Sequence, residues 1–151
     1  MAGEIVTIQI KGAEDIARAL KAMPPAMRGP TLATALRAGA TLVKKAYQQR
    51  IPIRKTLRGG WKNHPPGTAR RAVRIWTVRT GDQNWSDVQV GASNKAFYMR
   101  FLEFGTKYIT PRGYLRQAYA EQEANVLPVI AGVIWLKLQV VAAKLSAQQH
   151  P

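Results

Sequence analysis

The chain lacks the residues from which most catalytic sites are built. Cysteine is absent, which excludes a disulfide framework and a thiolate metal site. Histidine occurs only at His64 and His150, and His64 lies between an asparagine and a proline in a basic segment. The sequence has no Gly-x-Ser-x-Gly elbow and no glycine-rich phosphate loop, and its eight acidic residues are dispersed. We therefore expect no enzymatic activity, no catalytic residue, no cofactor and no metal.

Acidic residues are also missing from one long part of the chain. The sequence has 23 Lys and Arg against 8 Asp and Glu, a net charge of +15. No acidic residue lies between Asp15 and Asp82, a stretch that holds fifteen basic ones, whereas the charges of the remainder cancel. Such a block repels itself unless an anionic partner compensates for it. Nucleic acid, an acidic protein ring, or solvent around a basic face each fit this pattern.

A long apolar run is absent as well. The longest, over 126–136, has eleven residues and includes Pro128 and Gly132, whereas a membrane span needs roughly 17–25 residues. The first residues lack the basic region and apolar core of a signal peptide. We expect a soluble protein with no membrane partner.

With 151 residues, 46% of them hydrophobic, the chain can form one domain with a buried core. Residues 5–10 alternate as a strand, and residues 14–23 show helical spacing that ends at Pro24-Pro25. A longer helix is predicted over 31–50, with Pro30 in its first turn. Its apolar stripe includes Ala35, Gly39 and Ala46, whose small size suits close packing, which we expect to be against the domain's own sheet.

Residues 51–70 are rich in proline, glycine and basic side chains, and we expect a loop that leaves the core. Residues 72–79 and 85–91 then predict an antiparallel hairpin in which Trp76 belongs to the core. Trp61 could stack on an unpaired base or anchor a protein interface. The candidate contacts with DNA or an acidic partner are Arg54, Lys55, Arg58, Lys62, Arg70 and Arg71.

A short helix is predicted over 97–104, with Gly105 where the chain leaves it. From Tyr114 onward the pattern is again helical, and Asn125 and Pro128 are expected to kink or split the helix. Beyond Pro128 the helix is apolar on nearly every side, so it needs burial on more than one side. A neighbouring subunit is a plausible second partner. The expected fold is therefore α+β: a small antiparallel sheet flanked by a long amphipathic helix and a C-terminal helix, in one domain over 1–145 with a flexible tail over 146–151.

The most specific motif lies over residues 96–118. It reads Ala-Phe-Tyr-Met-Arg-Phe-Leu-Glu-Phe-Gly-Thr, followed after a short loop by Pro-Arg-Gly-Tyr-Leu-Arg-Gln-Ala. It resembles the Tyr-Ala-x-Phe-Val-Glu-Phe-Gly-Thr … Pro-Phe-Leu-x-Pro-Ala-Leu signature of the tail-completion (neck, head-to-tail joining) proteins of long-tailed double-stranded DNA bacteriophages. The chain departs from this pattern where Gly113 and Gln117 replace prolines and Tyr114 replaces phenylalanine. An apparent insertion over 55–66 interrupts an earlier family element.

The resemblance implies a structural protein of the virion neck, made in the cytoplasm of the bacterial host. Copies would form a ring, expected to be hexameric, between the head connector or adaptor proteins and the tail terminator or tail tube, with double-stranded DNA in the lumen. Two alternatives stay open: a nonspecific DNA-binding protein, and a neighbouring tail-terminator or head-completion role.

Glu103 is the acid that stands out, because it lies among aromatic residues and would need a partner if buried. Either it forms a salt bridge within the chain, for example with Arg100, Lys107 or Arg112, or it bridges two subunits of a ring. The candidate assembly and structural residues are Tyr98, Phe101, Glu103, Phe104, Gly105 and Trp135.

Overall fold

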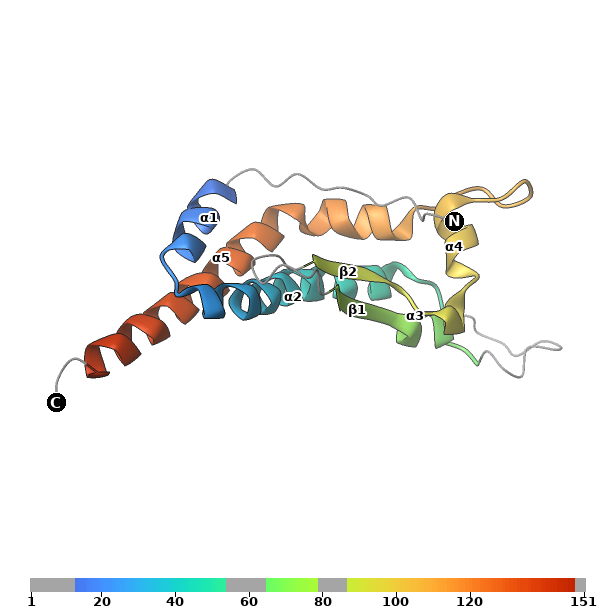
Figure 1. Ribbon diagram of the computed structural model, residues 1–151. Helices are drawn as coiled ribbons and strands as arrows, with labels where there is room; N and C mark the ends of the chain where they lie inside the picture. Colours follow the sequence, from blue (N-terminus) through green and yellow to red (C-terminus); the bar gives the residue numbers. More distant parts are fainter. Residues whose placement is uncertain (1–12, 54–64, 79–86, 149–151) are drawn as a thin grey trace.

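A computed structural model describes residues 13–53, 65–78 and 87–148 of the chain (Figure 1). The expected strand over 5–10, the turn after residue 79, and the basic candidates Arg54, Lys55, Arg58 and Lys62 lie outside the described residues, as do Trp61 and both histidines. The described elements are α1 (Ala13–Lys21), α2 (Pro25–Arg50), α3 (Thr68–Ala72), β1 (Val73–Val78), β2 (Asp87–Ala92), a 3₁₀ turn (Asn94–Ala96), α4 (Met99–Phe104) and α5 (Tyr114–Gln148).

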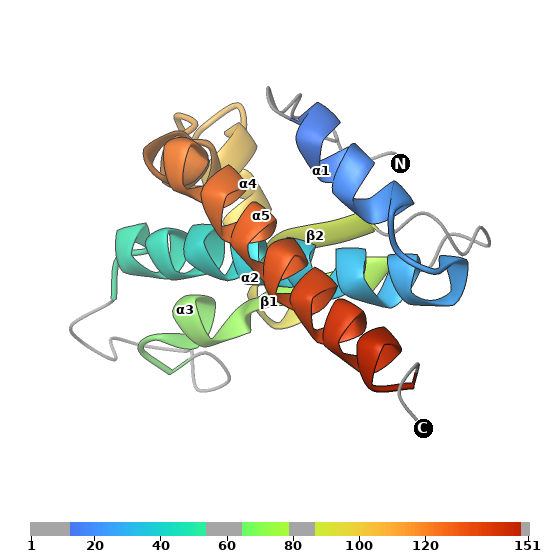
Figure 2. The ribbon, with the colours of Figure 1, turned by 90° about the vertical axis from the view of Figure 1, so that its left-hand side faces the viewer.

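The α+β fold is confirmed, and α2 is its central element. Strands β1 and β2 form an antiparallel pair that contacts α2, and α5 packs along α2 as well. Figure 2 shows α5 crossing α2, with α1 beside it. The buried side chains form two clusters, one where α2 ends near β1 and α4, and one where α1, α2 and α5 meet. Both clusters depend on the apolar stripe of α2, which the sequence pattern predicts correctly.

Helix α2 begins six residues earlier than predicted, so Pro30 lies inside the helix and not in its first turn. Pro25 takes the first-turn position instead, where a missing N–H costs nothing. Pro30 removes one backbone hydrogen bond from a 26-residue helix that is packed against other elements along its length. The Arg28 side chain donates to the carbonyls of Met23 (2.9 Å) and Lys21 (3.0 Å), which fixes the end of α1 against the start of α2.

Gly39 permits the close approach of another element, but that element is α5 and not the sheet. A Cβ atom at this position would lie 2.9 Å from Cγ1 of Ile130 and 3.1 Å from Cγ1 of Val126. The first contact is shorter than real Cβ atoms show, and the second is tighter than most, so α5 would have to shift. The sequence shows that a small residue is needed on this face of α2, but it does not show which neighbour requires it.

The two strands pair in the register Val73↔Ala92 to Val78↔Asp87, and alternate residues face opposite sides. Val73 is buried and Ile75 half-buried toward α2, whereas Arg74, Trp76 and Val78 are exposed. The predicted alternation is confirmed, but the assignment of Trp76 to the core is wrong, because its side chain is 41% exposed. Its ring lies over Gly91 of β2, where the missing side chain leaves room for it.

Helix α5 is continuous over 35 residues, so Pro128 does not split it. Figure 1 shows that its two halves run in different directions, as expected for a proline inside a helix. As a helix, Tyr114–Lys144 is long and apolar enough to span a membrane by length and composition alone, although the core helix of a soluble protein passes the same test. Here Val126, Ile130 and Ile134 are buried against the rest of the domain.

Candidate assembly surfaces

Glu103 on α4 is buried, with 7% of its surface exposed, and it binds the first turn of α5. Its carboxylate accepts hydrogen bonds from the backbone N–H groups of Leu115 (3.0 Å) and Arg116 (3.3 Å). These N–H groups have no partner within their own helix, and the positive end of the helix dipole favours an anion there. The expected salt bridge within the chain is therefore wrong: Glu103 pairs with no described cation and caps α5 instead.

The charge of Glu103 also acts on Tyr47, a buried residue near the end of α2. Burial is the larger cause that raises the pKa of the Tyr47 phenol above its ordinary value, and the negative charge of Glu103 raises it further. Glu103 thus lies where α2, α4 and α5 meet. Its position explains why one acid is kept among the aromatic residues of the motif.

Gly105 ends α4 with φ +77°, a left-handed conformation that favours glycine, which confirms the predicted exit from the helix. A Cβ atom there would lie 2.8 Å from Cδ of Pro111 and 2.9 Å from the carbonyl oxygen of Ile109. The following loop closes on itself, because Thr106 and Ile109 exchange backbone hydrogen bonds. The Arg112 N–H then donates to the Leu102 carbonyl at 2.7 Å, which brings the chain back to the point where α5 begins.

The aromatic residues of the motif point mostly outward. Phe97, Phe101 and Phe104 are between 41 and 59% exposed; Phe101 and Phe104 lie on one side of α4, and Phe97, two residues before the helix, continues that side by its spacing. We call these three residues the aromatic stripe. The Phe97 and Phe101 rings meet edge to face with centroids 6.2 Å apart. Tyr98, which is half-buried, packs against the core cluster around Met99.

A second exposed apolar surface lies on α5 beyond Pro128. Trp135 is 59% exposed, Leu136 64% and Val140 51%, while Ile134 and Val141 on the other side of the helix are buried. We call Trp135, Leu136 and Val140 the α5 face. Figure 1 shows this part of α5 at the opposite end of the molecule from α4. The aromatic stripe and the α5 face therefore cannot cover one another within one chain.

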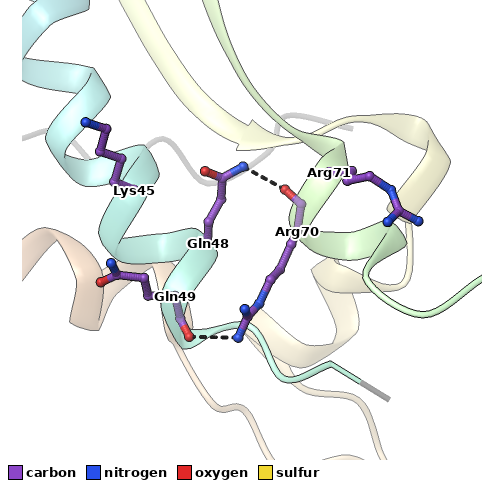
Figure 3. A pocket seen from close by; sticks show the side chains of 5 residues that line it. All are labelled: Lys45, Gln48, Gln49, Arg70 and Arg71. Carbon is purple, nitrogen blue, oxygen red and sulfur yellow. Dashed lines mark hydrogen bonds between the residues drawn. The ribbon is translucent and has the colours of Figure 1, made fainter. Parts of the chain in front are cut away.

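The basic candidates that the structure describes, Arg70 and Arg71, lie on α3 beside the end of α2. Arg70 donates to the carbonyls of Ile51 (2.7 Å) and Gln49 (3.2 Å), and Gln48 donates to the carbonyl of Arg70 at 2.8 Å. Figure 3 shows Arg70 reaching toward α2, whereas Arg71 points away from it. A shallow, open hollow is lined by these two arginines together with Lys45, Gln48 and Gln49.

These contacts correct the expected loop over 51–70 at both of its ends. Ile51 is buried in the core, and Thr68–Ala72 forms the short helix α3, in which Ala69 and Ala72 are buried. Arg70 is fixed by this packing because its guanidinium satisfies carbonyls at the end of α2, which have no partner within the helix. The basic surface of the described residues instead includes Arg71 with Arg37, Lys45 and Arg74, which are exposed.

A comparison with protein-family models matches residues 14–105 to the HK97-gp10-like family, described as "Bacteriophage HK97-gp10, putative tail-component". The match covers more than half of the chain. The chain belongs to this family. Comparisons with curated proteins and with solved structures returned no match. Membership of the HK97-gp10-like family supports a structural role in a bacteriophage tail.

The HK97-gp10-like match runs from α1 to the end of α4 and so includes the aromatic stripe, Glu103 and Gly105. The α5 face lies beyond it.

Sequence reasoning selected Trp135 but missed Leu136 and Val140, although the apolar pattern around the helix included them. It also missed the ion pair between Arg50 and Glu121 (2.8 Å), which ties the end of α2 to α5 and is supported by a hydrogen bond from Arg50 to Gln117. Among the described residues, no group of three or more acidic or histidine side chains could hold a metal ion.

Proposed function

We propose that the protein is a structural subunit of the phage neck, where copies form a ring that joins or completes the tail at the junction with the head and surrounds the DNA passage. The observation that carries this proposal is the α5 face. In a protein of a tail-component family, an exposed tryptophan and two large aliphatic residues on one helix favour a contact with another subunit.

The α5 face is costly to leave in water. Burial of apolar surface stabilises by about 25 cal/mol per Å², and a tryptophan side chain alone can bury roughly 150–250 Å². A neighbouring copy that covers Trp135, Leu136 and Val140 would complete the burial that the domain begins with Ile134 and Val141. The exposed and the buried side chains belong to the same helix, so assembly would also restrain the half of α5 beyond Pro128.

The basic residues have a role in such a ring. Arg37, Lys45, Arg71 and Arg74 are exposed, and no acid occurs between Asp15 and Asp82 to neutralise them. Either these residues, with Arg54, Lys55, Arg58 and Lys62, face DNA phosphates in the lumen, or they dock on an acidic connector or tail ring. Alanine substitution of Arg54, Lys55, Arg58 and Lys62 together separates the two cases. Loss of DNA retention with intact rings supports the lumen, and loss of head–tail joining supports the protein partner.

The test of the proposal is Trp135→Glu, compared with Trp76→Glu, which places the same change at an exposed tryptophan on the sheet. We expect Trp135→Glu to remain folded, to elute as a monomer in light-scattering chromatography, and to give particles without completed necks in electron microscopy. Trp76→Glu should retain assembly. Rings formed equally well by both variants, or particles that lack the protein at the neck, would contradict the proposal.

The second candidate, a free nonspecific DNA-binding protein, is favoured by the acid-free basic surface alone. Contacts with phosphates would be independent of sequence and would weaken steeply with salt. Tight binding of duplex DNA by the Trp135→Glu monomer in a gel shift, with no particle association, would favour this reading. A tail-terminator or head-completion role would be distinguished by the position of the ring in images of the particle.

A further inference from the structure

The aromatic stripe on α4 is uncovered by the described part of the chain. Phe101 and Phe104 on α4, and Phe97 just before it, are exposed on one side, whereas the other side of the helix holds the buried Met99 and Glu103. The helix is fixed from behind by the Glu103 cap on α5 and by the Arg112 to Leu102 backbone hydrogen bond. The stripe is therefore a rigid apolar surface, which favours recognition because little conformational entropy is lost on binding.

Cations lie on α4 and on the segments that follow it. Arg100, Lys107, Arg112 and Arg116 are all exposed, and the guanidinium of Arg116 lies 5.7 Å from the centroid of the Phe104 ring. The only acid between Asp87 and Glu121 in the sequence is Glu103, which is buried. None of the four cations forms an ion pair with another described residue. The surface thus combines exposed aromatic rings with uncompensated positive charge.

A hollow of about 450 Å³ adjoins the stripe where α4 meets the start of α5. Phe104 forms part of its wall, and Arg112 and Arg116 line it from the side of α5. Glu103 also contributes to the lining, but its carboxylate oxygens are directed to the amides of Leu115 and Arg116. Two arginines beside an aromatic ring suit a carboxylate on a partner that also carries apolar side chains.

We propose that the aromatic stripe and this hollow form a docking surface for an acidic, apolar segment of a different protein of the particle. Its apolar side chains would pack on Phe97, Phe101 and Phe104, and its carboxylates would pair with Arg112 and Arg116. This inference deepens the proposed function and rests on it, because it states the chemistry of one neighbour in the neck.

Charge complementarity selects this partner over a second copy of the chain. A copy brings a net charge of +15, so its approach is repelled overall, although Glu14, Asp87 and Glu123 are exposed acids that form no ion pair among the described residues. Duplex DNA would satisfy the cations but would leave the phenylalanine rings unpacked unless its bases were unpaired or unstacked. An acidic segment with apolar anchors satisfies both.

The probe is a fluorescein-labelled 18-residue peptide with Leu and Phe on one helical face and Glu on the other, measured by fluorescence anisotropy with the full chain. Its twin carries Lys in place of each Glu, and a scrambled peptide keeps the charge but disperses the apolar residues. We expect the Glu peptide to bind at least ten-fold more tightly than either control peptide. Phe101→Ala should weaken it at least five-fold, and the double variant Arg112→Ala with Arg116→Ala should remove most of the preference for Glu over Lys. The matched control, Arg74→Ala with Trp76→Ala, removes an exposed cation and ring from the sheet and should change the affinity less than two-fold.

Four outcomes would overturn the inference. The first is equal binding of the Glu peptide and the scrambled peptide, and the second is an equal effect of Phe101→Ala and of the control variant. The third is loss of self-association in Phe101→Ala, and the fourth is that Phe101→Ala loses as much affinity for a 20-base-pair DNA duplex as for the Glu peptide. The third result would assign the stripe to a second copy and the fourth to nucleic acid. Because the measurement uses the isolated chain, it can fail while Trp135→Glu still abolishes necks, and the proposed function would then stand without this partner.

Discussion

Replacing Glu103 by alanine removes the contact that holds the start of α5 against α4. The carboxylate accepts two backbone hydrogen bonds, at 3.0 and 3.3 Å, in a site that leaves 7% of the residue exposed. Hydrogen bonds to a charged group contribute about 1.5–3 kcal/mol each, but alanine also relieves the cost of burying the charge. We expect Glu103→Ala to lower the free energy of unfolding by about 2–4 kcal/mol, since two N–H groups then lose their acceptor.

For a chain of this length, a loss of that size corresponds to a fall in melting temperature of roughly 5–15 °C. Circular dichroism at one fixed protein concentration measures it, because assembly would make the melting temperature depend on concentration. Glu103→Gln keeps one acceptor oxygen and should lose about half as much stability. Glu123→Ala, which removes an exposed carboxylate from α5, should change stability by less than about 0.5 kcal/mol. A Glu103→Ala variant that melts within 1 °C of the parent chain and assembles normally would refute the capping argument.

Three further predictions concern packing and protonation. Gly39→Ala should lower the free energy of unfolding, measured in urea, by about 1–3 kcal/mol, because the added Cβ would lie 2.9 Å from Ile130. Gly132→Ala on α5, whose added Cβ would have nothing within 4 Å, should leave that free energy unchanged or raise it. Gly105→Ala should likewise lower stability by about 1–3 kcal/mol, because φ is +77° and Pro111 is too close; Gly113→Ala, with φ +59° but open space, should cost less. Burial, and then the charge of Glu103, raise the pKa of Tyr47, so its contribution to stability is present below about pH 10 and is lost as pH rises further. Tyr47→Phe should therefore weaken the alkaline loss of stability relative to the parent chain, and an unchanged pH profile between 9 and 11 would contradict this.

Periodicity predicted the elements whose two sides differ in polarity. The alternation over 73–78 placed Val73 and Arg74 on opposite sides of the strand, as the structure has them, but it did not identify the buried side, and Trp76 was assigned to the core wrongly. The stripe of α2 was also predicted correctly, because an amphipathic helix carries its own orientation in its sequence. Two of the wrong predictions concerned the partner and not the element: Gly39 packs on α5, and Glu103 binds backbone amides.

Glu103 shows why such partners escape sequence reasoning. A carboxylate near Arg100, Lys107 and Arg112 in the sequence suggests an ion pair, because side-chain charges can be counted along a chain. The unpaired N–H groups at the start of a helix cannot be recognised in this way, because nearly every residue type carries a backbone N–H. Only the return of the chain through Gly105 and Arg112, which places α5 against α4, makes those amides the nearest partners.

Helix α5 is the opposite case to α2, because beyond Pro128 its sequence is apolar on nearly every side and so carries no information about which side faces the core. The crossing with α2 decides this: Ile130 meets Gly39, Ile134 follows one turn later on the same side, and Trp135 and Leu136 are left exposed. If the protein acted as a monomer, positions 135, 136 and 140 would stay in contact with water, and polar residues there would be more soluble than apolar ones. The presence of large apolar side chains at all three positions is the feature for which the domain alone gives no reason, and a second protein surface gives one.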